Sequence, residues 1–257
     1  MLSFALFRPH PIVEPVFFTV VHDDKSYVVQ IKRLASAKRF TLRVRNAQRD
    51  VVLTIPKRST LRSAHEFAAR NAAWIGARLD RLAQPIPFEP GAIIPLRGED
   101  HEITHVFHHR ASLWIERSGD IKLQKNRINV SGDAAHINRR VRDYLRREAK
   151  MALEASVARH CSQLNLKSRS VTLRDTTSRW GSCSSQGSLN FSWRLILAPD
   201  FVLDYLAAHE VAHLIHLDHS PQFWEVVEQL YPNYEQAELW LKHHGPGLYR
   251  YGSVVKA

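Results

Sequence analysis

The stretch HEVAHLIHLDH, residues 209 to 219, places four histidines and one glutamate in a segment that is otherwise almost wholly apolar. It continues a run from Phe201 in which Asp204 is the only charged residue before Glu210. Apolar residues would surround such a helix on every side, which predicts a buried helix from about Phe201 to Ile215. Because polar groups on a buried helix are costly unless they are paired, hydrogen-bonded or close to a metal, the stretch predicts a metal site.

The spacing of these side chains fits a zinc site. His209 and His213 are four residues apart, so in a helix they project from one face and can bind the same zinc ion at about 2.0–2.1 Å. Glu210 falls beside them, where it can take a proton from a zinc-bound water, as in other HExxH motifs. The chain has 15 histidines, so two of them can share this spacing without binding a metal. They could lie on the surface, or in the core with their nitrogens hydrogen-bonded. The apolar helix and the further histidines favour the metal site.

A catalytic zinc ion takes three protein ligands, and the sequence offers several candidates for the third. His219 follows in a predicted turn just before the next helix, and we expect it to complete the site. His216 would reach the metal only if the helix continued past it. Four glutamates on the later helices are a further alternative: Glu225, Glu228, Glu235 and Glu238.

Residues 178–224, SRWGSCSSQGSLNFSWRLILAPDFVLDYLAAHEVAHLIHLDHSPQFW, resemble the YgjP-like metallopeptidase family, which is related to SprT-like and Wss1-like zinc proteases. The matching features are the RWGSC hairpin, the Asn-x-x-Trp-Arg strand, the HExxH helix and the His-x-x-x-Phe-Trp that follows it. The resemblance extends back to the predicted strands between Arg39 and Pro56. It therefore covers most of the chain after about residue 30.

This resemblance implies a zincin-like α+β fold and a peptidase that acts on peptide or protein substrates. His209, His213 and His219 would be the ligands of Zn²⁺, and Glu210 the catalytic acid/base. Zinc would polarise the scissile carbonyl, while Glu210 would activate water and then protonate the leaving amine. Candidates for stabilising the oxyanion are Tyr205, Arg179, His244 and Tyr249.

The hairpin before the histidine helix is a candidate substrate-binding edge, because zincins bind extended peptide by pairing it with a strand. That edge would be Trp180 to Ser184 or Leu189 to Trp193. The side chains of Trp180, Phe191 and Trp193 are expected in the core. Cys183 is expected to be a buried structural thiol. With Cys161 it makes two cysteines, too few for a disulfide scaffold, and this favours a reducing compartment.

The remaining sequence predicts an N-terminal β-rich region with one helix, residues 1–130, before a zincin-like catalytic region, residues 131–257. The N-terminal strands are expected at Val16 to Val21, Tyr27 to Arg33, Arg39 to Val44 and Val51 to Ile55, and around Ile93, Leu113 and Ile128, with the helix from Ser59 or Thr60 to about Leu82. In the catalytic region we expect a helix from about Asp133 to Cys161, a strand from Ser170 to Leu173, and a hairpin with its turn near Ser185 to Gly187. The helix caps are expected at Asp200, Ser220 and Asn233, with Gly245-Pro246 closing the last helix.

The net charge of +11 and the basic runs KRFTLRVR and NRRVRDYLRREAK, residues 38–45 and 138–150, allow two interpretations. Either they bind nucleic acid or a nucleotide, or arginines line the solvent face of a strand and a helix. Three alternatives to a plain peptidase follow: a protease recruited to DNA-bound proteins, a metal-dependent hydrolase of nucleotide phosphoanhydrides, and a non-catalytic zinc module. The first two come from the resemblance, and the third would more naturally use four ligands.

The sequence contains no run of 18 apolar residues that could span a membrane, and no membrane partner is expected. The segment of residues 1–15 is apolar in part but has no basic region before it, which is not typical of a signal peptide. We therefore expect a cytoplasmic protein. Nothing in the sequence indicates its oligomeric state.

Overall fold

The computed structural model describes residues 17–45, 49–118, 125–176 and 179–253, so Val16 and the segment 1–15 lie outside the described residues. The chain divides into two compact units, with the division after Leu82, and each unit has its own hydrophobic core. Helices and strands are mixed in both, so the predicted α+β class is confirmed. No helix in the described ranges combines the length and the apolar character needed to cross a membrane.

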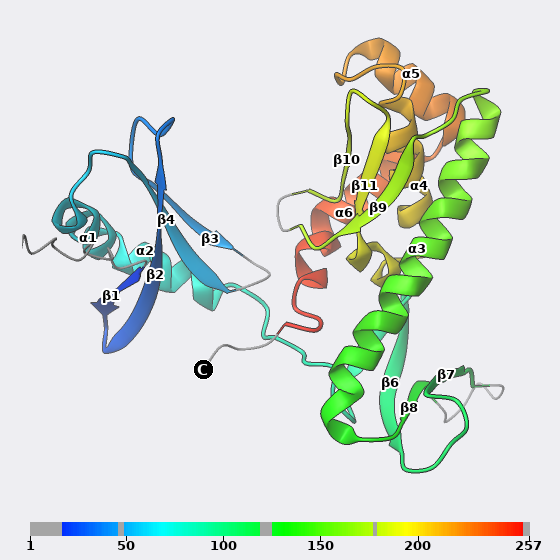
Figure 1. The fold of residues 1–257 in the computed structure, drawn as a ribbon, viewed down its shortest axis with the longest axis horizontal. Coiled ribbons are helices and arrows are strands. Elements are labelled where there is room, and N and C mark those ends of the chain that lie inside the picture. The colour runs from blue at the N-terminus through cyan, green and yellow to red at the C-terminus, as the bar shows by residue number, and fades with distance from the viewer. Residues whose placement is uncertain (1–16, 46–48, 119–124, 177–178, 254–257) are drawn as a thin grey trace, which may run out of the picture. The chain divides into compact units, whose positions relative to one another are not determined.

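The N-terminal unit is a four-stranded sheet packed against two helices. Its strands are β1 (Phe17–His22), β2 (Lys25–Leu34), β3 (Thr41–Arg45) and β4 (Asp50–Pro56), in the order β1-β2-β4-β3 (Figure 1). The parallel pair β2 and β4 lies at the centre, and Val29 and Leu53 are fully buried there with Ile75.

The expected single helix of this unit is two helices, α1 (Leu61–Arg70) and α2 (Ala72–Asp80). The interruption is Asn71, whose side chain donates a hydrogen bond to the carbonyl of Phe67 at 2.8 Å. Asparagine competes in this way with the regular backbone hydrogen bonds of a helix.

Strands β5 (Ile93–Leu96), β6 (Glu99–Val106), β7 (Leu113–Glu116) and β8 (Asn126–Ser131) form a second sheet, in the order β5-β6-β8-β7. The expected boundary at residue 130 assigned this sheet to the N-terminal region. Its buried residues Ile103, Ile128 and Val130 belong instead to the core of the C-terminal unit. The sheet packs against the long helix α3 (Ile137–Gln163), which follows a short 3-10 turn, η1 (Ala134–His136). For this reason the division of the chain falls after Leu82.

Helix α3 also supports a third, smaller sheet of β9 (Ser170–Arg174), β10 (Gly181–Cys183) and β11 (Ser188–Ser192) (Figure 1). The order is β10-β11-β9, with β11 antiparallel to β10 and parallel to β9. The turn of the β10-β11 hairpin ends at Gly187, whose φ of 73° suits glycine. The expected hairpin and turn are therefore present.

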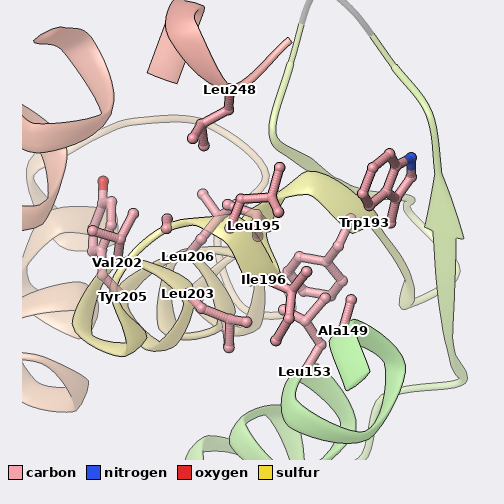
Figure 2. Packing of buried hydrophobic residues seen from close by; sticks show 14 of the residues in the cluster. Ala149, Leu153, Trp193, Leu195, Ile196, Val202, Leu203, Tyr205, Leu206 and Leu248 are labelled. Carbon is pink, nitrogen blue, oxygen red and sulfur yellow. The ribbon is translucent and has the colours of Figure 1, made fainter. Parts of the chain in front are cut away.

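The 3-10 segment η2 (Trp193–Leu197) links this sheet to α4 (Asp200–Ala212), and all five of its residues are buried. Figure 2 shows Ile196 of η2, Leu153 of α3 and Leu203 of α4 converging in one core. The buried guanidinium of Arg194 donates hydrogen bonds to the carbonyls of Leu248 and Tyr251, which ties η2 to the end of the last helix. These contacts fix the position of α4.

Two more helices follow, α5 (Pro221–Leu230) and α6 (Tyr234–Leu248). Ser220 caps α5 as expected, accepting a hydrogen bond from the backbone N–H of Phe223 at 3.4 Å. Asp200 is the first residue of α4 rather than its cap, which is Pro199, and its carboxylate pairs with Arg97 at 2.7 Å.

The predicted end of α6 is wrong. The helix continues through Gly245-Pro246 to Leu248, since a proline in the last turn removes only one backbone hydrogen bond. Asn233 precedes α6 without the expected side-chain cap.

Candidate metal centre

Helix α4 ends sooner than its apolar pattern predicts, and this early end shapes the site. Its last residue is Ala212, and the backbone N–H of His216 donates to the Ala212 carbonyl at 3.1 Å. His209 and Glu210 lie in the last turn of the helix, and His213 is the C-cap residue. The chain then turns, so that His219 returns to the face that carries His209.

The three histidines His209, His213 and His219 form a cluster whose candidate ligand atoms all lie within 4.8 Å of one another. The Nε2 atoms of His209 and His219 are 3.3 Å apart. Two nitrogens that bind one tetrahedral zinc ion at about 2.0–2.1 Å lie about 3.3 Å from each other. The cluster therefore fits a metal ion, and that these residues bind one stays a prediction.

The environment of the histidines favours the neutral imidazole that a metal needs. His213 Nδ1 lies 2.8 Å from the carbonyl of His216. A carbonyl only accepts, so Nδ1 carries the proton and Nε2 is left with a free lone pair. Burial, together with the charges of His213 and His219, lowers the pKa of His209 to about 3. Burial likewise lowers the pKa of His213, opposed by its hydrogen bond to the His216 carbonyl.

Helix α5 holds the returning histidine in place. The ring of Phe223 stacks on His213 with centroids 4.4 Å apart and lies edge-on to His219 at 4.9 Å. Trp224 adds a second aromatic contact to His219. The Ser220 cap and its neighbour Asp218, which accepts a hydrogen bond from the Ser220 N–H at 3.2 Å, fix the entry to α5. The Ser-Pro start of α5 thus positions His219.

Glu210 is 3% exposed, and its Oε2 has no hydrogen-bond partner among the described residues. Burial raises the pKa of Glu210 to about 8, and the positive charge of Arg179 acts in the opposite direction. On its other side the carboxylate lies against β10, because a Cβ placed on Gly181 would collide with Oε1. A buried carboxylate oxygen without a partner, on the residue that follows His209 in the helix, is suited to a general base that accepts a proton.

The other candidate ligands lie outside this cluster. The side chain of His216 is not part of it, and neither are Glu225, Glu228, Glu235 and Glu238 within the ranges that the structure describes. His216 instead contributes its backbone carbonyl, which orients His213.

The four oxyanion candidates have different surroundings. The hydroxyl of Tyr205 is 3.4 Å from Nδ1 of His209, so it adjoins a candidate ligand. Tyr249 stacks on Trp180 with centroids 5.0 Å apart, and His244 packs on Trp240 at the same separation. Arg179 acts electrostatically on Glu210. None of these contacts identifies an oxyanion-stabilising group.

Sequence reasoning missed the closeness of Gly181 to Glu210, although a glycine inside a strand is a signal for close approach of another group. Cys183 is half-buried rather than buried, and its thiol donates to the Ser184 carbonyl at 3.3 Å. Phe191 and Trp193 are core residues, as expected, whereas Trp180 is half-buried.

Only one of the two candidate substrate-binding edges is available. Strand β11 is paired on both sides, with β10 and β9, so Leu189 to Ser192 offers no free backbone groups to a peptide. Strand β10 pairs with β11 alone among the described strands and contacts α4. The edge beside Glu210 is therefore Gly181 to Cys183.

The basic runs are partly neutralised within the chain. In β3, Arg45 pairs with Asp50. On α3, Arg139 lies 3.7 Å from Asp143 and Lys150 lies 3.0 Å from Glu154. These pairs favour the interpretation of solvated helix and strand faces over a surface for polyanions.

Comparison with known protein families gives a match to a metallopeptidase family. A family model described as "YgjP-like, metallopeptidase domain" matches residues 38–244. No curated protein matches the chain significantly. Among solved structures, the metallopeptidase zymogen of Pyrococcus abyssi abylysin is 20% identical over 36% of this chain and 95% of its own, with a TM-score of 0.33. At that score the likeness carries no weight.

Proposed function

Since the chain belongs to the YgjP-like metallopeptidase family, we propose that it is a zinc-dependent peptidase whose ligands are His209, His213 and His219 and whose catalytic residue is Glu210. The observation that carries this proposal is the convergence of three imidazoles, together with a buried carboxylate oxygen on the residue after His209 that has no hydrogen-bond partner in the described chain. A structural site would use four ligands and would leave that carboxylate unexplained.

Zinc is the metal that this donor set suits best, because catalytic zinc is commonly held by three protein ligands such as imidazoles, which would leave a further position for water. When bound, it would lower the pKa of water and polarise a carbonyl. The chain's own residues prepare the site for it. The His216 carbonyl holds the proton of His213 on Nδ1, and the aromatic rings of Phe223 and Trp224 keep His219 in place.

Glu210 is proposed to move the proton. Its Oε2 accepts a proton from the attacking water and later delivers it to the nitrogen of the leaving amine. Burial keeps bulk water from this oxygen, and the close backbone of Gly181 prevents the carboxylate from moving away.

The peptide substrate is proposed to bind as an added strand on β10. Gly181 to Cys183 present backbone groups on the side that faces away from β11, and an extended peptide can pair with them. Because Gly181 contacts Glu210, such a peptide would pass next to the catalytic carboxylate. All these parts come from the proposed catalytic region, residues 131–257.

Both cysteines, Cys161 and Cys183, are free thiols. This supports the proposal that the protein works in a reducing compartment such as the cytoplasm.

The test is incubation of the zinc-loaded full chain with a chemically unfolded protein, followed by mass spectrometry of the fragments. Glu210→Gln serves as the matched control, since it keeps the shape of the side chain but cannot take the proton. We expect new peptide termini with the wild type and none with the variant. DNA-bound proteins and nucleoside triphosphates are tested in parallel. Hydrolysis of triphosphates without any peptide cleavage would contradict the proposal.

A further inference from the structure

A cavity of about 320 Å³ is lined by residues of all three strands of the small sheet, β9, β10 and β11, and by the segment that leads into β10. Its wall includes two arginines, Arg174 at the end of β9 and Arg179 just before β10, together with the polar side chains of Ser182 and Asn190. None of the described residues that line it is acidic. The cavity is therefore a positively charged pocket with hydrogen-bonding groups.

This pocket adjoins the proposed catalytic carboxylate. Gly181 lines the pocket, and it is also the residue whose missing side chain leaves room for Glu210 Oε1. Arg179 is close enough to Glu210 for its charge to act on the carboxylate. A group held against Ser182 in the pocket would lie one residue along β10 from the position that contacts Glu210.

The two arginines are available for a ligand. Arg174 donates from Nε to the side-chain oxygen of Asn190 at 3.2 Å, which orients its guanidinium without neutralising it. Within the described ranges, neither Arg174 nor Arg179 forms a salt bridge with an acidic side chain. Exposed guanidinium groups at the mouth of one pocket are suited to a carboxylate, which they can bind through paired hydrogen bonds.

Strand pairing decides which part of a peptide would reach this pocket. Ser182 and Asn190 are direct partners across β10 and β11, so their side chains lie on the same face of the sheet. A peptide residue placed opposite Ser182 on the free edge would project from that face too. Its side chain would enter the pocket, while the residues on either side of it would point toward the face that carries Gly181 and Glu210.

We propose that this pocket is a specificity subsite for an acidic side chain, aspartate or glutamate, of the peptide substrate, close to the scissile bond. The inference rests on the proposed peptidase function. It names the substrate class as extended peptides with a carboxylate at one fixed position relative to the cleaved bond. The net charge of +11 would assist the capture of such peptides.

The first experiment determines cleavage preference with a synthetic peptide library in which every position is randomised and the C-terminus is amidated. We expect Asp and Glu to be enriched at a single position within about two residues of the cleaved bond, the reach of one paired strand segment. A matched pair of peptides, Glu against Gln at that position, should differ by about 10-fold or more in kcat/KM, as expected for hydrogen bonds to a charged group. Cleavage without enrichment of Asp or Glu at any single position would overturn the proposal.

Substitutions of the two arginines then test whether the preference for an acidic residue arises from this pocket. Arg174→Gln and Arg179→Gln should each reduce the Glu/Gln ratio, and the double variant should bring it near one. Arg169→Gln is the matched control, because Arg169 is exposed, hydrogen-bonds Gln186 at 2.6 Å and does not line the pocket. A ratio that is unchanged in the double variant would overturn the proposal.

Binding separates this inference from the peptidase proposal. The same Glu and Gln peptides, carrying a fluorophore, are titrated against zinc-loaded Glu210→Gln protein and read by anisotropy. Tighter binding of the Glu peptide, lost in the Arg174→Gln/Arg179→Gln background, supports the subsite even if no hydrolysis is found. Equal binding of both peptides overturns the subsite and leaves the peptidase proposal standing if hydrolysis is observed.

Discussion

Strand β6 and the end of α4 carry histidine pairs with the same spacing, yet among the described residues only the helical pair belongs to a cluster that could hold a metal ion. His101 and His105 are four residues apart in β6, as His209 and His213 are in and just after α4. Four residues of a strand span about 13 Å, whereas four residues of a helix rise only about 6 Å on one face. Identical spacing therefore gives a chelating pair only where the chain is helical.

The histidines of β6 also form hydrogen bonds with backbone carbonyls. His101 hydrogen-bonds the carbonyl of Glu99 at 2.8 Å, and His105 that of Gly132 at 2.6 Å. His109, beyond the end of β6, stacks on Trp114 with centroids 3.7 Å apart. In the α4 region a backbone carbonyl orients His213 but leaves its other nitrogen for the cluster. What distinguishes a metal site is the convergence of the free nitrogens.

The largest effect is expected from His219→Ala. Two imidazoles would remain to bind zinc. Loss of a hydrogen-bond partner of a ligand lowers metal affinity by about 10–100-fold, and loss of a ligand itself should lower it by more. Peptidase activity should be lost with it. Competition with a chromophoric chelator measures the affinity, and His105→Ala provides the matched histidine deletion in the strand region. If His219→Ala and the wild type bound zinc with equal affinity, His219 would not be a ligand and the contrast between the helical and strand histidines would be contradicted.

Glu210→Gln should lower kcat by about 10²–10⁴-fold while zinc content stays at the wild-type value, because the amide cannot accept the proton of the water. Metal content is measured by elemental analysis on the same sample that is assayed. Turnover at the wild-type rate would make Glu210 a structural residue.

Gly181→Ala should reduce activity by about 100-fold, the cost of a misplacement of about 1 Å. The new Cβ would collide with Oε1 of Glu210 and displace the carboxylate, while the three histidines keep their positions. Gly247→Ala is the control, since nothing lies within 4 Å of a Cβ built there. The assay is kcat on a cleaved peptide, and an unimpaired Gly181→Ala enzyme would contradict the close contact with Glu210.

His101→Ala should leave zinc content and activity unchanged but reduce the free energy of unfolding by about 1–3 kcal/mol. His101 is 2% exposed, and its loss removes a buried side chain together with its hydrogen bond to the Glu99 carbonyl. Urea denaturation followed by circular dichroism measures the change. Loss of zinc in this variant would show that the strand histidines contribute to a metal site after all.

The smallest effect is expected from His216→Ala. Zinc affinity should change by less than about 10-fold, the low end for an outer partner, because the backbone carbonyl that orients His213 remains. The chelator competition used for His219→Ala measures it. An effect as large as that of His219→Ala would mean that the His216 side chain binds the metal.

The helical pair and its glutamate could be predicted from the sequence because the whole motif lies within one local element. His219 could also be predicted, since Ser220-Pro221 signals the start of the next helix and hence a turn before it. The end of α4 at Ala212 could not be predicted, as Leu214 and Ile215 continue the apolar pattern of the helix.

Features that depend on contacts between distant parts of the chain are harder to predict from the sequence. Strand β6, with the sequence EDHEITHV, was missed because acidic residues are depleted in strands, and only its partners show that it is one. The division of the chain after Leu82 depends on which core buries Ile103 and Ile128, and hydrophobic periodicity says which residues are buried but not against what. The contact between Gly181 and Glu210 likewise joins residues of two distant segments.

X-ray absorption at the zinc edge of the zinc-reconstituted full chain tests the central claim most directly. The account predicts about one zinc ion per chain, bound by three imidazole nitrogens at about 2.0–2.1 Å with a light-atom fourth ligand. Absence of bound zinc, or a sulfur ligand at about 2.3 Å from a residue such as Cys183, would contradict it.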